Sequence, residues 1–152
     1  MTVTNAISDT TENNILKLIF NATAWANVAQ NGTTPDASTA LALHSSDPGD
    51  SGNMSINEVT TAAYTGYVRA SKLRATGAGG WTVTTNSVSP FDTIAFPAGT
   101  AGSTGVSATH FSVGKLGGGT SEMFWRGDIQ PPIACGNGVT PQLTTGTTIT
   151  LD

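Results

Sequence analysis

The chain has 152 residues and a formal net charge of −4, with 38% hydrophobic and only 11% charged residues. Typical domains carry about 25% charged residues. In this chain, Thr residues and 18 Gly take the place of the missing charged residues. The six basic residues are too dispersed for a face that binds nucleic-acid phosphates, so no nucleic-acid partner is expected. Only Arg69, Lys72 and Arg74 lie close together, and this cluster is interpreted as a solvated strand end.

The cysteine content and the targeting patterns of the sequence also limit the cellular compartment in which the protein is expected. The single cysteine, Cys135, excludes an internal disulfide framework of the kind that small secreted folds often need. The sequence shows neither a signal-peptide pattern nor a run of about 18 apolar residues, so no membrane partner is expected. We therefore expect a protein that is made in a reducing cytoplasm and stays there until it assembles or acts.

Residues 1–8 are short and polar and are expected to form an N-terminal arm, whereas residues 9–29 carry the only helical pattern. Asp9 followed by Glu12 is a variant of the capping box. Apolar residues then recur at helical spacing: Ile15, Leu18, Ile19, Ala22, Trp25 and Ala26. The helix is predicted to end near Val28 and to cover one end of a sheet.

The segment 40–59 links this helix to the remainder of the chain. Leu41 and Leu43 alternate with smaller residues, which predicts a half-buried strand over 40–44. A turn is expected over 45–49, where Ser, Asp, Pro and Gly follow one another.

Residues 40–152 are predicted to form a β body, because short apolar runs alternate with turn residues. The expected strands are 40–44, 59–73 with an interruption at Gly66, 81–85, 92–96, 106–113, 122–127 and 147–151. A hairpin is expected around the glycines 117–119, and Pro131 and Pro132 are expected to end its second strand or place it at an edge. The pattern predicts a mainly β fold of one domain, residues 1–152: an antiparallel β-sandwich or jelly-roll-like domain with one N-terminal α-helix.

No local motif selects a catalytic residue. His44 and His110 lie on separate predicted strands without a nucleophile motif, so both are expected to be structural. Cys135 stands in a bland apolar setting and is expected to be a buried or idle thiol.

No metal or cofactor site is expected either. Asp47, Asp50 and Asn53 recur at three-residue spacing, whereas calcium loops alternate every second residue and end in Glu. The Gly-rich segment 114–120 lacks the Gly-Lys-Ser/Thr ending and the strand–loop–helix context of a phosphate loop, which indicates a turn.

Short segments then follow in a characteristic order: 43–48 (LHSSDP), 57–59 (NEV), 67–70 (YVRA), 94–97 (IAFP), 105–111 (GVSATHF), 124–127 (FWRG) and 148–152 (TITLD). Together they resemble a family of small structural proteins from tailed bacteriophages. Members are commonly labelled tail fibre proteins, and similar proteins are described as capsid cement or decoration proteins. The chain departs from the family pattern in the longer loop 50–56, in extra residues before Thr109 and in the Cys-containing connection 131–141.

The resemblance implies a virion structural protein without catalysis or cofactor. It implies a capsid cement or decoration protein that binds the outer surface of the major capsid protein shell as a homotrimer and stabilises it. The alternative is a tail-associated or tail fibre protein whose loops touch host surface glycans.

Candidate interface residues are those that suit an interface better than a monomer surface, because aromatic and Arg residues dominate interface hot spots: Trp25, Arg69, Trp81, Trp125 and Arg126. For each tryptophan, filling the core is an equal alternative. A small cell-wall hydrolase is a further alternative, for which Asp47, Asp50 and Glu58 form the densest acidic group.

Overall fold

A computed structural model describes residues 8–25, 36–51, 53–115 and 122–151 of the chain. The predicted N-terminal arm and the expected glycine turn at 117–119 lie outside these residues, except for Ser8. The chain divides into two compact units, one containing Met1–Ala37, Leu73–Asp92 and Thr145–Asp152, the other Ser38–Lys72 and Thr93–Thr144.

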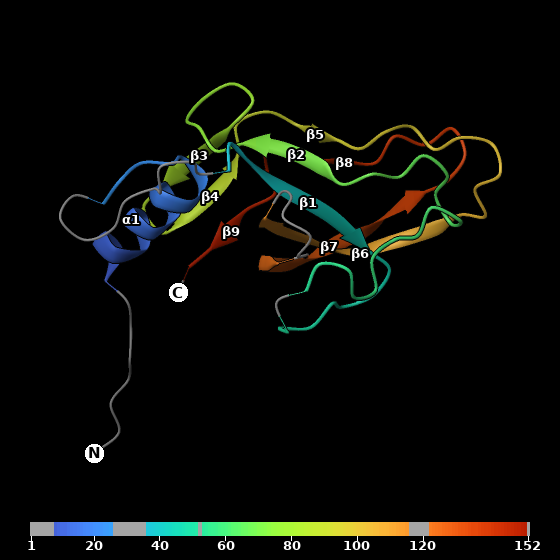
Figure 1. The fold of residues 1–152 in the computed structure, drawn as a ribbon, viewed down its shortest axis with the longest axis horizontal. Helices are drawn as coiled ribbons and strands as arrows, with labels where there is room; N and C mark the ends of the chain where they lie inside the picture. The colour runs from blue at the N-terminus through green and yellow to red at the C-terminus, as the bar shows by residue number, and fades with distance from the viewer. Residues whose placement is uncertain (1–7, 26–35, 52, 116–121, 152) are drawn as a thin grey trace, which may run out of the picture. The chain divides into compact units, whose positions relative to one another are not determined.

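The first unit holds the helix and a three-stranded sheet of order β3-β4-β9. Its elements are α1 (Asp9–Phe20), β3 (Trp81–Thr84), β4 (Ser87–Pro90) and β9 (Ile149–Thr150). The helix packs against β3 and β4, as Figure 1 shows. Among the helices of the described residues, none has the length and apolar character needed to cross a membrane.

The helix begins and ends differently from the prediction. Ser8, not Asp9, is the N-cap, and its side chain accepts a hydrogen bond from the Thr11 N–H at 3.4 Å. The helix ends at Phe20 rather than near Val28, because Ala22 adopts a left-handed φ of 53° that turns the chain. The continuation predicted over 26–29 lies outside the described residues.

The buried face of α1 also differs from the predicted stripe. Glu12, Leu16 and Phe20, at four-residue spacing, are buried, while the flanking residues are half-buried. The Phe20 ring meets Trp81 edge-on, with ring centroids 4.8 Å apart and an interplanar angle of 70°. These aromatic residues form the centre of the first unit's core.

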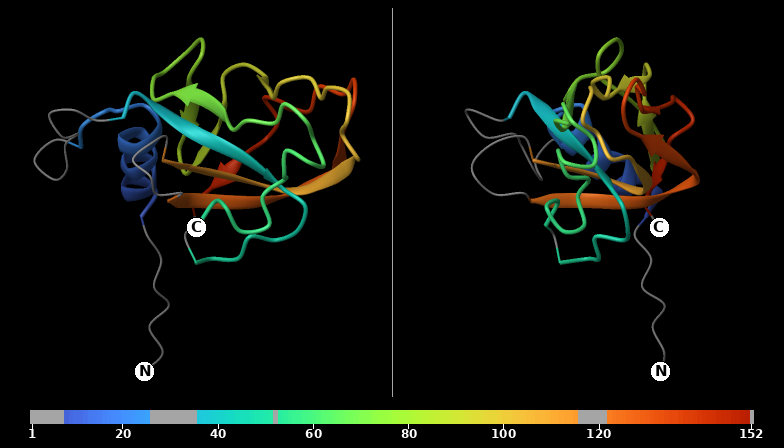
Figure 2. Two further views of the ribbon diagram at one scale, coloured as in Figure 1. Left: turned by 45° about the vertical axis from the view of Figure 1, so that its right-hand side comes forward. Right: turned by 90° about the vertical axis from the view of Figure 1, so that its right-hand side faces the viewer.

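The second unit is built on a four-stranded antiparallel sheet of order β2-β1-β6-β7. Its strands are β1 (Ser38–His44), β2 (Ala70–Leu73, whose last residue is counted in the first unit), β6 (Val106–Lys115) and β7 (Met123–Cys135). A second, two-stranded sheet pairs β5 (Ile94–Ala95) with β8 (Gln142–Leu143). Figure 2 shows β1, β6 and β7 side by side in both views.

The predicted fold class is confirmed: the chain is mainly antiparallel β, consistent with a β-sandwich-like domain, with one helix near the N-terminus. The predicted hairpin is confirmed by the pairing of β6 with β7. In contrast to the half-buried strand expected, residues 39–44 of β1 are all buried, because β1 lies between β2 and β6 and both of its faces are covered.

The largest differences in strand bounds concern β2 and β7, and the other predicted strands differ by one or two residues at an end. Of the strand expected over 59–73, only Ala70–Leu73 forms, since residues 59–69 contain turns that precede it. Of the two alternatives predicted for Pro131 and Pro132, the edge position is confirmed: β7 continues to Cys135 and lies at the edge of the sheet, where its outer side needs no donors.

Candidate functional site

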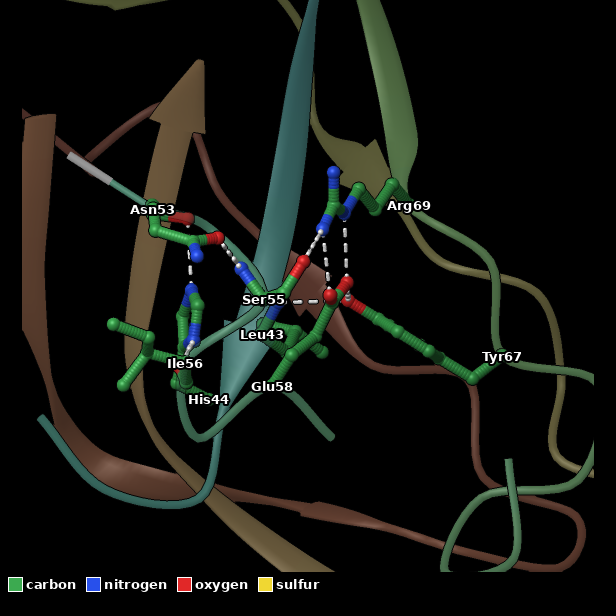
Figure 3. A network of polar contacts seen from close by, with 9 residues as sticks. Leu43, His44, Asn53, Ser55, Ile56, Glu58, Tyr67 and Arg69 are labelled. Atoms are coloured by element: carbon green, nitrogen blue, oxygen red, sulfur yellow. Dashed lines mark hydrogen bonds and ion pairs between the residues drawn. The ribbon is translucent and has the colours of Figure 1, made fainter. Parts of the chain in front are cut away.

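The segments 57–59 and 67–70 meet in one polar network beside β1, shown in Figure 3. The Arg69 guanidinium donates two hydrogen bonds to the Glu58 carboxylate, from Nε to Oε1 at 2.8 Å and from Nη2 to Oε2 at 2.7 Å. The same Nη2 also donates to the Ser55 hydroxyl at 3.2 Å. This two-point geometry fixes both side chains, because the fork of an arginine matches the two oxygens of a carboxylate.

Tyr67 connects this ion pair to the strand. Its hydroxyl donates to Glu58 Oε1 at 2.9 Å and accepts the Leu43 N–H at 3.1 Å. The Leu43 carbonyl in turn accepts the Val59 N–H at 2.9 Å. Burial raises the pKa of Tyr67, so its hydroxyl stays protonated and keeps its donor role.

His44 anchors the loop that precedes the network. Its side chain is fully buried, with Nδ1 2.9 Å from the Ile56 carbonyl and Nε2 2.7 Å from the Ser112 hydroxyl. These partners fit a neutral ring whose Nδ1–H donates to Ile56 while Nε2 accepts the Ser112 O–H. Burial lowers the pKa of His44, which favours this neutral form.

The His44–Ser112 pair has the spacing of a base and a nucleophile but not their access. Both residues are 0% exposed, and a backbone carbonyl rather than a carboxylate orients Nδ1. A substrate carbonyl therefore has no route to the Ser112 hydroxyl in this conformation. The pair instead fastens the loop over the face of the sheet that carries Ala42 and Ser112.

Two of the three acidic residues named for the hydrolase alternative bind arginines separately, and the third, Asp50, lines a depression at the start of β7. Glu58 pairs with Arg69, and Asp47 Oδ1 lies 2.9 Å from Arg126 Nη1. Within the described ranges, no three His, Cys, Asp or Glu side chains gather so that they could hold a metal ion. Two carboxylates, each paired with its own arginine, give no acid–base pair of the kind that hydrolysis requires.

The predicted basic cluster is not a solvated strand end. Arg69 belongs to the network, Lys72 is only 5% exposed, and Arg74 binds backbone carbonyls in the first unit. All three residues therefore have structural positions. Cys135 is buried as predicted, and burial raises the pKa of its thiol, so the unreactive protonated form is favoured.

The predicted interface residues fall into different environments: Trp81 is 1% exposed in the core of the first unit, Trp25 is half-buried, Arg69 is ion-paired, and Trp125 and Arg126 lie on β7. Core filling is thus the role of Trp81 in this structure. Only Trp125 and Arg126 stand together on one element.

These two belong to a surface at the start of β7. Phe124, 39% exposed, meets Trp125 edge-on with ring centroids 6.3 Å apart. Residues 123–126 and Asp50 line an open depression of about 440 Å³. Sequence reasoning did not place Phe124 or Asp50 at this surface, although the alternation in 122–127 followed by two prolines indicates an edge strand with two different faces.

Sequence comparison agrees with the resemblance to phage structural proteins. A family model described as Podophage GP4 fiber I protein gp80 matches residues 6–149. The match includes the helix, the network segments and β7, and so extends over nearly the whole chain. No curated protein shows a significant match.

Proposed function

We propose that this chain, which belongs to the podophage GP4 fiber I protein gp80 family, is a non-catalytic structural subunit of a phage tail fibre. The family is one of phage virion structural proteins. The observation that carries the proposal is the match over residues 6–149, because it covers the fold rather than one motif. In this role the partners are neighbouring fibre or tail subunits and further copies of the chain.

The geometry supports a structural role. The residues that bear reactive groups are used to hold the fold: His44 and Ser112 are buried against each other, and Glu58 and Asp47 are bound to arginines. The surface with exposed aromatic character lies on an edge strand, where association between subunits is favoured by unpaired backbone groups.

A capsid decoration role is the second candidate. It rests on the resemblance to phage structural proteins carried by segments such as 43–48 and 67–70, since proteins similar to that family are described as capsid cement or decoration proteins; the fold brings these two segments together at the network. In this role the chain would bind the outer surface of the major capsid protein shell, as a homotrimer. Many weak contacts of about 1–2 kcal/mol would then act together against shell opening.

Immunogold labelling of purified virions with an antibody to this chain separates the two roles. Labelling along the tail fibres is the expected result. Regular labelling over the head would overturn the fibre proposal in favour of decoration. An antibody to the major capsid protein serves as a positive control for head labelling.

The same experiment on mildly disrupted particles exposes epitopes that assembly covers. Absence of this chain from both intact and disrupted virions, checked by mass spectrometry of the particles, would overturn both roles.

A further inference from the structure

The strand β7 has one unpaired side. It pairs with β6 on one side, and in the part of the chain that the structure describes no strand lies along its other side. An isolated bridge joins Asn53 to Glu122 just before β7 begins. Near the other end of β7, Pro131 and Pro132 have no backbone N–H groups to donate. The register with β6 shifts before Trp125 and after Asp128, so the regular part of the open edge is the short segment 125–128, with Gly127 inside it.

The register fixes which residues point their backbone groups outward. Leu43 uses its N–H and C=O on the side away from β6, so His44 and Ala42 are the residues of β1 that face β6. Their partners His110 and Ser112 then face β1, which leaves Phe111 and Val113 to face β7. The Lys115 N–H bonded to the Glu122 carbonyl at 2.9 Å follows the same alternation.

On β7 the alternation continues. Gly127 and Trp125, opposite Phe111 and Val113, face β6, so the N–H and C=O groups of Arg126 and Asp128 point to the open edge. The side chains of Arg126 and Asp128 are 36% and 69% exposed. Arg126 forms an ion pair with Asp47 at 2.9 Å, and an Asp128 carboxylate oxygen lies 3.1 Å from His110 Nε2; both Arg126 and Asp128 retain exposed surface for a further partner.

The charges on this edge are self-complementary in one register only. In an antiparallel pair centred on Gly127, Arg126 of one copy lies opposite Asp128 of the other, twice. Centring the pair on Arg126 or on Asp128 would place like charges opposite each other, which is destabilising.

We propose that two copies of this chain associate by antiparallel pairing of their β7 edges about Gly127, with reciprocal Arg126–Asp128 contacts. The interface is the same patch on both copies, as two-fold symmetry requires. Gly127 itself is explained within the chain, since a Cβ there would lie 2.7 Å from the Phe111 ring. The inference goes beyond the proposed function, and its two-fold pair differs from the homotrimer of the decoration role.

The test is the mass of the purified full chain, 15.4 kDa as a monomer, by sedimentation velocity over a concentration series. Low salt is used because exposed ion pairs are screened. The wild type is expected to dimerise. Arg126→Asp and Asp128→Arg should each weaken self-association at least about tenfold, because each creates two like-charge contacts per dimer.

An equimolar mixture of the two single variants is the decisive arm. It places Asp opposite Arg at both contacts again, so the mixture should associate about as tightly as the wild type. A misfolded variant would not be rescued in this way. Lys17→Glu, which changes net charge as much as Arg126→Asp does, is the matched control and should leave association unchanged.

Other outcomes overturn the proposal. A wild type that stays monomeric throughout the series excludes the pair. A dimer or trimer that neither single variant weakens forms through another surface. Single variants that remain apart when mixed, although circular dichroism shows both folded, exclude the Gly127 register.

Discussion

The Tyr67 hydroxyl accepts the Leu43 N–H at 3.1 Å and so takes the place of a backbone carbonyl beside β1. The neighbouring strand β2 begins only at Ala70, so no backbone group of that strand reaches Leu43. The Tyr67 side chain thereby extends the hydrogen-bond ladder along β1 by one bond. Since Leu43 is fully buried, an unpaired N–H at this point would carry the cost of a lost hydrogen bond.

Tyr67→Phe is expected to lower the free energy of unfolding by about 1–3 kcal/mol, because the Leu43 N–H loses its acceptor and Glu58 loses a donor. Urea unfolding followed by fluorescence measures the loss. The neighbouring variant Val68→Ala is the control, since Val68 is 59% exposed and surface substitutions change stability by less than about 0.5 kcal/mol. Equal midpoints for both variants would show that the hydroxyl is dispensable.

Glu58 and Arg69 are expected to be coupled. Glu58→Gln and Arg69→Met should each cost about 1–3 kcal/mol, because each leaves a partly buried charge without its partner. The side chains are 17% and 24% exposed, so solvent screening keeps these costs below those of a fully buried pair. In a double-mutant cycle the coupling energy should exceed about 1 kcal/mol. Strict additivity of the two single variants would mean that the two-point contact contributes no stability.

The mainly β fold could be predicted because strands leave a local signature. The alternation in 106–113 and 122–127 identified β6 and β7, and the glycines between them indicated their hairpin. Local patterns do not show how many sides of a strand are covered. Residues of β1 therefore suggested a half-buried strand, whereas tertiary packing buries both faces.

The candidate site could be predicted only in part for the same reason. Glu58 and Arg69 lie in segments that the resemblance singled out, but their pairing depends on the turns of 59–69, which no periodicity reveals. Likewise Trp81 and Trp125 both lie in strand-like runs of the sequence. Trp81 is the buried one because it packs against Phe20, a contact that the local pattern does not show. The end of α1, where Ala22 turns the chain, is further stabilised by a residue far along the chain, Arg74.

Arg74 caps the helix from a distance. Its Nε and Nη2 donate to the carbonyls of Ile19 and Leu18 at 2.6 and 2.9 Å, groups that the last helical turn leaves without an intrahelical donor. Arg74→Met should lower the free energy of unfolding by about 1.5–3 kcal/mol, since both bonds involve a charged donor.

Arg74→Lys is the matched variant, because it keeps the positive charge near the negative end of the helix but loses the two-point hydrogen bonding of the guanidinium. Its cost is expected to lie between those of the wild type and Arg74→Met. Far-UV circular dichroism during urea unfolding measures both. If Arg74→Lys is as stable as the wild type, the charge and not the two-point contact stabilises the helix end.

His44 is expected to make the protein acid-sensitive. Burial lowers the pKa of His44 in the folded state, whereas the unfolded chain titrates near the ordinary value of about 6.5. Between the two values the unfolded state binds more protons, so stability is fully present above pH ~6.5 and falls as the pH drops through the folded-state pKa. One such group changes stability by at most about 1.4 kcal/mol per pH unit.

His44→Gln separates this contribution from that of the carboxylates. The glutamine amide can accept from Ser112 and donate to the Ile56 carbonyl but does not titrate, so the variant should lose less stability on acidification than the wild type. Urea unfolding at a series of pH values between about 7.5 and 5 gives both curves, a range that brackets the ordinary histidine pKa. Parallel curves would show that His44 keeps the same pKa in the folded and unfolded states, and that its burial between β1 and the loop carries no proton linkage.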